Sequence, residues 1–292
     1  MFKRQYQIVL LLISCLCGMH VQARNAVIIY AHDAGEYRMI INNLTKSLDI
    51  NNINHSIYLK GDWGQASPEQ DQLLITIGTD ALVFASKQKP LSSIYATAIP
   101  RINFNILLSS NSYLGNKFAD GELHPLYIEQ PVDAYLSIMS DNGNIEKIAV
   151  FHDDDDINTY QATKSIADKK YTIEFINVDS ADFSVPALNA KLMQFDLVIL
   201  QPGKYINTFF LKWLLHAAFQ QSLPVFAFSN NFLDAGAALS IETDLTRYHE
   251  DILLNMQLLL NNGKTVTVYP SNRRIDGNKT MLRYLGLDIL TE

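Results

Sequence analysis

The stretch "LLITIGTDALVFAS" (73–86) contains both patterns from which the fold can be predicted. Residues 73–77 are an aliphatic run typical of a buried β-strand, and the spacing of apolar residues after Asp80 predicts a helix. At the carboxyl end of a parallel strand, free backbone N–H groups favour a polar or anionic ligand group, and open α/β sheets bind their ligands there. Gly78 and Thr79 are therefore candidate ligand-binding residues. The alternative is that Thr79 or Asp80 only caps the helix.

Short apolar segments alternate with helical segments along the rest of the chain. The strands that we predict cover 26–31, 55–60, 71–78, 99–106, 145–152, 171–178, 195–202, 223–230 and 265–271. The predicted helices cover 37–48, 79–89, 159–170, 185–194, 207–221, 246–262 and 279–287. This alternation predicts βαβ units, and hence parallel sheets that are covered by helices on both faces.

The βαβ pattern starts a second time at the strand 145–152, after a joining stretch at 127–143. The sequence therefore predicts an α/β protein with two Rossmann-like lobes of similar size. We expect the first lobe to comprise residues 24–130 plus 242–264, and the second lobe to comprise 131–241 plus 265–292.

The N-terminus has the pattern of a secretory signal peptide. Lys3 and Arg4 supply a positive region, the apolar run "IVLLLISCLCGM" follows, and "VQA" (21–23) suits a signal peptidase. Cleavage after Ala23 would remove both cysteines and leave an exported, periplasmic protein without thiols. The alternative is that "LISC" (12–15) is a lipobox, so that Cys15 is lipidated and anchors the protein to a membrane.

The composition and the absence of several motifs exclude some classes of function. The 292 residues are 48% hydrophobic and 18% charged, with a net charge of −7, which argues against nucleic acid as a partner. No P-loop, G-x-G-x-x-G, G-x-S-x-G or H-E-x-x-H motif occurs, so we expect no enzyme, no cofactor and no zinc. The run "HDDDDIN" (152–158) does not complete a calcium loop, because Thr159 and Ser165 occupy its glycine and glutamate positions. Its aspartates either solvate a turn or bind a cationic ligand group.

The order of segments resembles a known family. The segments that carry the resemblance are "YAHDAGEYRMIINNL" (30–44), "DQLLITIGTDALVFA" (71–85), "YIEQPVDAYLSIMSDNGNIEKIAVFHD" (127–153), "FDLVILQPG" (195–203), "LPVFAFSNNFLDAGAALSI" (223–241) and "RRIDGNKTMLRYLGLDI" (273–289). Together they are similar to bacterial ABC-transporter substrate-binding proteins of the type I periplasmic-binding fold, in the branch with tryptophan- and tyrosine-binding members. The chain departs from that branch at "NFNILLSS" (103–110), where an Asp-Pro is common, and at Gln201-Pro202-Gly203, where an acidic residue is common. Ligand identity therefore does not carry over.

The resemblance implies a hinged, monomeric protein whose lobes close over a small polar molecule, with amino-acid-like compounds as candidates, which a membrane permease then receives. The ligand-binding residues that we expect are His32, Asp33, Gly78, Thr79, Asn103, Asn105, Asp153, Asp154, Gln201, Tyr205, Ser229, Asn230 and Asn231. One alternative is a periplasmic sensing module that reports to a membrane signalling protein. The other alternative is an enzyme on the same two-lobed scaffold.

Overall fold

The structure is a computed structural model that describes residues 25–32, 35–62, 69, 72–139, 145–152, 171–178, 185–203, 206, 208–262, 267–287 and 289. The predicted signal peptide and the predicted helix at 159–170 lie outside these residues.

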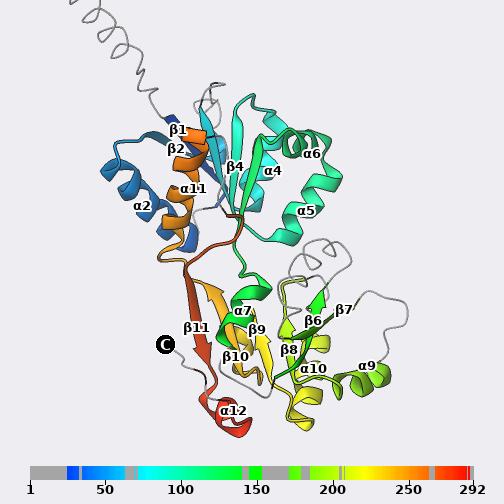
Figure 1. Cartoon of the computed structure of the whole chain (residues 1–292). Helices are drawn as coiled ribbons and strands as arrows, with labels where there is room; N and C mark the ends of the chain where they lie inside the picture. The colour runs from blue at the N-terminus through cyan, green and yellow to red at the C-terminus, as the bar shows by residue number, and fades with distance from the viewer. Residues whose placement is uncertain are drawn as a thin grey trace, which may run out of the picture.

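The first lobe is built on a five-stranded parallel sheet (Figure 1). Its strands are β1 (Asn25–Tyr30), β2 (Asn54–Leu59), β3 (Leu73–Ile77), β4 (Ser93–Ile99) and β5 (Leu123–Tyr127), in the order β2-β1-β3-β4-β5. All five residues of β3 are buried, as expected for a strand that is covered on both faces. Helices α2 (Gly35–Ile50) and α11 (Tyr248–Asn262) pack on one face. Helices α4 (Thr79–Gln88), α5 (Arg101–Ser110) and α6 (Ser112–Ala119) pack on the other.

The second lobe repeats this arrangement. Its strands are β6 (Lys147–His152), β7 (Thr172–Asn177), β8 (Leu197–Leu200), β9 (Val225–Ala227), β10 (Leu239–Thr243) and β11 (Arg273–Gly277), in the order β11-β10-β9-β8-β6-β7. Helices α7 (Val132–Ile138) and α12 (Lys279–Tyr284) cover one face, and α9 (Val185–Leu192) and α10 (Thr208–Gln220) cover the other. The order β7-β6-β8-β9-β10 matches β2-β1-β3-β4-β5, which confirms the predicted doubling of the βαβ pattern. Strand β11 differs because it is antiparallel to β10.

Crossover segments connect the lobes after β5 (128–131), after β10 (244–247) and between α11 and β11 (267–272). Side chains tie these segments together. The Gln130 amide donates to the Thr243 hydroxyl at 3.0 Å and to the Asn272 carbonyl oxygen at 3.3 Å. The Thr243 hydroxyl in turn donates to the Ile128 carbonyl oxygen. Figure 1 shows that the lobes meet at these segments.

The predicted strand at 99–106 is wrong. The strand there is β4, which ends at Ile99, and helix α5 begins at Arg101. Pro100 separates them with φ −60° and ψ 135°, an extended conformation that precedes the first helical residue. Asn103 and Asn105 therefore lie on a helix and not in a loop after a strand.

The predicted last strand at 265–271 is also wrong, because the last strand is β11. Described residues of 267–271 bond to side chains of α11 in place of a strand ladder. The Thr267 N–H donates to the Asn255 side chain at 3.3 Å, and the Ser271 N–H donates to the Asp251 carboxylate at 3.2 Å. Strand β11 itself, "RRIDG", is a charged edge strand without the apolar run used for prediction.

Among the described residues, no helix is long and apolar enough to cross a membrane.

Candidate functional site

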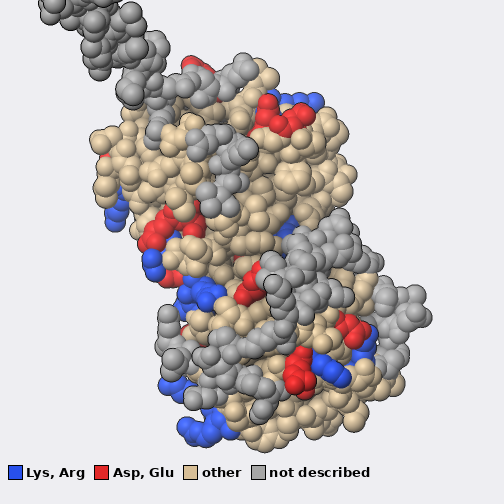
Figure 2. Space-filling view, in the orientation of Figure 1, with Lys and Arg blue, Asp and Glu red and all other residues tan. Residues whose placement is uncertain are grey.

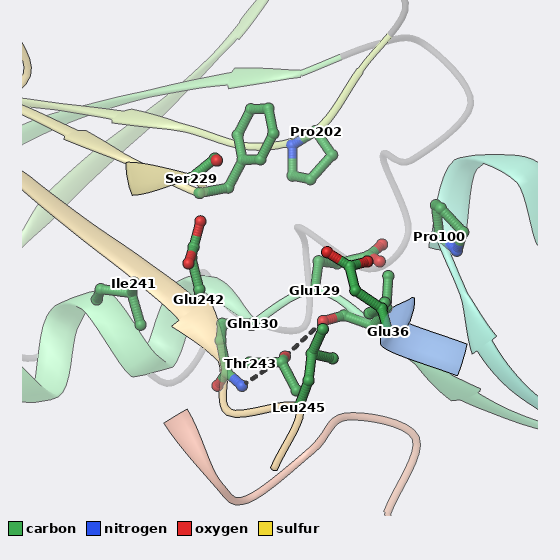
Figure 3. A pocket seen from close by; sticks show the side chains of 12 residues that line it. Glu36, Pro100, Glu129, Gln130, Pro202, Ser229, Ile241, Glu242, Thr243 and Leu245 are labelled. Atoms are coloured by element: carbon green, nitrogen blue, oxygen red, sulfur yellow. Dashed lines mark hydrogen bonds between the residues drawn. The ribbon is translucent and has the colours of Figure 1, made fainter. Parts of the chain in front are cut away.

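A cavity of about 350 Å³ lies between the lobes (Figure 3). Its volume falls in the range of small-molecule pockets. Residues that follow the carboxyl ends of strands in both sheets line it, together with residues of the crossover segments. The lining residues are Glu36, Pro100, Ile128, Glu129, Gln130, Pro202, Phe228, Ser229, Ile241, Glu242, Thr243 and Leu245. The carboxyl ends of strands in both sheets, where open α/β sheets bind their ligands, therefore border one cavity.

Glu129 is the most constrained carboxylate of the cavity. Its side chain is buried, and its Oε1 accepts the backbone N–H of Arg101 at 2.6 Å. The Arg101 guanidinium is buried too, with its Nε 3.8 Å from the same oxygen. A buried carboxylate requires such compensation, since removal of a charge from water is costly. Glu129 thereby fixes the turn at Pro100 from which α5 starts.

Glu242 is held from two sides. Its Oε1 accepts the Asn230 backbone N–H at 2.8 Å, and its Oε2 pairs with the Arg274 guanidinium at 2.5 Å. Arg274 also pairs with Asp276 at 2.8 Å. Figure 2 shows acidic and basic side chains next to each other where the two lobes meet.

Glu36 is the third carboxylate, and it comes from the first turn of α2. A carboxylate at this end of a helix is favoured by the helix dipole. The described residues give Glu36 no ion-pair partner, in contrast to Glu129 and Glu242. In Figure 3 its carboxylate extends toward the part of the cavity that Glu129 borders.

The remaining wall is largely apolar. Pro202 lies on the side of the second lobe, and Pro100 and Leu245 lie on the opposite side (Figure 3). Phe228 and Ile128 also line the cavity. Phe228 is fixed by an edge-to-face contact with Phe232, whose ring centre is 5.0 Å away. The site thus combines an apolar surface with a few convergent polar groups, as ligand pockets do.

The junction at Gly78-Thr79 lies at the β1/β3 point where the strand order of the first sheet reverses, and Gly78 packs against Tyr37, the residue after the lining Glu36. Gly78 has φ +88°, and a Cβ there would lie 2.9 Å from the Tyr37 hydroxyl oxygen. Gly78 itself is the N-cap of α4 and forms no side-chain cap bond, so neither Thr79 nor Asp80 is the cap residue. The Thr79 hydroxyl accepts the Asn103 amide at 3.3 Å, and the His32 ring lies 2.5 Å from the Asp80 carboxylate.

Burial and neighbouring charges change the pKa of the tyrosine that packs against Gly78. Burial, followed by the charges of Glu36 and Asp80, raises the pKa of Tyr37. The Tyr37 hydroxyl therefore stays a neutral hydrogen-bonding group at physiological pH.

The structure places the predicted residues in three groups. Ser229 lines the cavity, and Gln201 is buried directly before the lining residue Pro202. The β1/β3 junction brings together His32, Gly78, Thr79 and Asn103. Asn230 and Asn231 line a second cavity of about 460 Å³, together with Leu233, Asp234, Asp276, Gly277 and Lys279. Asn105 lies further along α5 and lines neither the inter-lobe cavity nor the second cavity. Asp33, Asp153, Asp154 and Tyr205 lie outside the described residues.

Several lining residues were not predicted from the sequence. They are Glu36, Glu129, Gln130, Phe228, Glu242 and Thr243. Phe228 could have been found, because it directly precedes the predicted Ser229 at the end of β9. Glu129 and Gln130 follow β5, a strand that the sequence analysis missed.

Comparison with known proteins supports the fold. No protein-family model matches the sequence, and neither does any curated protein. Among solved structures, the chain is similar to the ligand-free, open structure of a substrate-binding protein with adhesive properties from Clostridium difficile. The two are 14% identical, the match covers 92% of this chain and 97% of that chain, and the TM-score is 0.57.

The fold is that of the type I periplasmic-binding proteins.

Two further matches have lower TM-scores. An ABC domain in complex with L-Trp from Streptococcus pneumonia is 16% identical, with 91% of this chain and 96% of that chain covered and a TM-score of 0.49. A conserved domain protein from Vibrio cholerae is 14% identical, with 92% and 96% covered and a TM-score of 0.48. The predicted fold is confirmed by the match with a TM-score of 0.57 alone, and placement in the branch of tryptophan- and tyrosine-binding members stays a prediction.

Proposed function

We propose that this protein is an exported, periplasmic substrate-binding protein that captures a small polar molecule between its lobes and delivers it to an ABC permease. The observation that carries the proposal is the cavity that residues after strands of both sheets and the crossover segments line together. A ligand there would contact both lobes at once, so it would bind the closed arrangement more tightly than the open one.

The β1/β3 junction belongs to the same proposal. His32 and Thr79 follow the strands β1 and β3, and Asn103, on helix α5, donates to the Thr79 hydroxyl at the same junction. We assign these three residues to the part of the binding site that forms as the lobes close. Thr79→Ala would then weaken binding of a ligand that the cavity admits, without loss of the fold.

A thermal-shift screen of the purified protein tests this function, with amino acids, amines, nucleosides, sugars and short peptides as the panel. A ligand that binds only the folded state stabilises it by about 2.7 kcal/mol at a hundredfold excess over its dissociation constant. We expect one chemical class to raise the melting temperature. A panel without any such class would contradict the function.

Uptake measurements in cells then separate transport from sensing. Deletion of the gene abolishes uptake of the bound compound at low concentration if the protein serves a permease. Unchanged uptake, with loss of the transcriptional response to that compound, would instead identify the sensing module.

A further inference from the structure

The charge of the inter-lobe cavity restricts what it can bind, and this inference rests on the proposed function. Three carboxylates line the cavity, from Glu36, Glu129 and Glu242, while none of its described lining residues is Lys, Arg or His. A ligand carboxylate would meet like charges in a partly dehydrated site, which is unfavourable.

Two of the three carboxylates already have a guanidinium partner, and one of these partners, Arg274, is shared with Asp276. Arg101 lies next to Glu129 at 3.8 Å, and Arg274 pairs with Glu242 at 2.5 Å. Each of these carboxylates also accepts a backbone N–H, from Arg101 and Asn230 respectively. Glu36 is the lining carboxylate without an ion-pair partner among the described residues, and it is exposed.

The apolar wall indicates which kind of molecule would carry a positive charge into the cavity. The Phe228 ring, two prolines and aliphatic side chains make up most of the surface away from the carboxylates. Such a wall accommodates a hydrocarbon body, and an aromatic face also attracts a nearby cation. An inorganic ion would leave this apolar surface unused.

We propose that the cavity binds a small organic monocation, a primary amine with an apolar body and no free carboxylate, whose ammonium group pairs with Glu36. Removal of the Glu36 carboxylate, which has no ion-pair partner among the described residues, then weakens the selectivity for charge and leaves the apolar contacts in place. This assignment excludes free amino acids as the preferred ligand class.

Calorimetric titration with four probes of one shape tests this proposal. The probes are phenethylamine, phenylalanine, 3-phenylpropionate and 2-phenylethanol, which are a cation, a zwitterion, an anion and a neutral molecule. We expect phenethylamine to bind at least about tenfold more tightly than the other three, the magnitude of one charged hydrogen bond. No heat from phenethylamine at millimolar concentration, or tighter binding of the anion or zwitterion, overturns the proposal.

Glu36→Gln tests the role assigned to that side chain. We expect it to weaken phenethylamine about tenfold and to leave 2-phenylethanol unchanged. Glu146→Gln is the matched control, because Glu146 is exposed and precedes β6 at the opposite end of its sheet. Melting temperatures of both variants show that they fold. Equal affinities of wild type and Glu36→Gln for the amine would refute the pairing.

The outcome also separates this inference from the proposed function. If the broader panel yields an anionic, zwitterionic or sugar ligand and no amine binds, the proposed binding function stands and the amine assignment fails. If no compound of either set binds, both fail.

Discussion

Gln130 donates its side-chain amide to the hydroxyl of Thr243 at 3.0 Å, and this bond joins the chain after β5 to the end of β10. Both residues line the inter-lobe cavity. The same amide reaches the Asn272 carbonyl oxygen at 3.3 Å, so one side chain joins the crossover segments 128–131 and 267–272 to the end of β10. The contacts that join the crossover segments and the cavity wall thus share residues, so under the proposed function a bound ligand would be coupled to the position of the lobes.

Loss of this amide is expected to destabilise the connection between the lobes. Gln130 is only 3% exposed, so Gln130→Ala leaves buried polar groups without their partner and should lower the free energy of unfolding by about 1–3 kcal/mol. Urea denaturation measures the change. Gln257→Ala is the control, since Gln257 makes an exposed bond to Asn51 at 3.3 Å, and it should change stability by less than about 0.5 kcal/mol. Equal effects of the two substitutions would show that Gln130 is not a structural connection.

Gly78 is expected to tolerate no side chain. In Gly78→Ala, a φ of +88° adds backbone strain and the new Cβ lies 2.9 Å from the Tyr37 hydroxyl oxygen. Gly121→Ala provides the comparison, because Gly121 has φ +73° and nothing within 4 Å of its Cβ position. The control should cost about 1–2 kcal/mol from backbone strain alone, and Gly78→Ala should cost more by urea denaturation. A smaller cost at Gly78 would mean that Tyr37 moves freely.

The Tyr248 hydroxyl is expected to stabilise the end of β4. It accepts the Ala98 backbone N–H at 2.9 Å and lies 2.9 Å and 3.0 Å from the carbonyl oxygens of Leu126 and Tyr127. Ala98 has φ +52°, within an irregularity of the β4–β5 pairing next to Pro100. Tyr248→Phe should therefore cost about 1–3 kcal/mol, whereas Tyr284→Phe, at a 56% exposed ring, should be nearly neutral. A neutral Tyr248→Phe would contradict this role.

Stability is expected to fall at alkaline pH. Burial raises the pKa of Tyr95, Tyr135 and Tyr248 above the ordinary value of 10.0. Above pH 10.0 the unfolded chain loses these protons while the folded protein retains them, so the unfolded state is favoured as pH rises. Their contribution is fully present below pH 10.0 and declines above it. Urea midpoints between pH 8 and 11 measure the decline, and a flat profile would contradict it.

Much of the fold was predictable because buried parallel strands require continuous aliphatic runs. "LLITI" and "LVIL" satisfy this requirement, and both are fully buried strands. "LHPLY" and "RRIDG" do not, and both strands were missed. The apolar residues of "IPRINFNI" belong to two elements, because Pro100 ends the strand and starts a helix.

The site was predictable only for residues at the carboxyl ends of parallel strands, where open α/β sheets bind their ligands. Ser229 was selected on this ground, and it lines the cavity. Thr79 and Asn103 were selected in the same way and contact each other, although residue 103 lies on a helix and not after the strand predicted at 99–106. Glu129, Gln130 and Thr243 lie where the chain crosses between lobes. Their proximity depends on how the lobes meet, and no local sequence pattern encodes that arrangement.

Calorimetric titration of a cavity-filling variant tests the account most directly. Ser229→Trp places an indole in the inter-lobe cavity, and Asn231→Trp places the same group at the second cavity. The account predicts that the ligand found by thermal shift binds wild type and Asn231→Trp with similar affinity and fails to bind Ser229→Trp. Undiminished binding to a folded Ser229→Trp would contradict the claim that the ligand lies between the lobes.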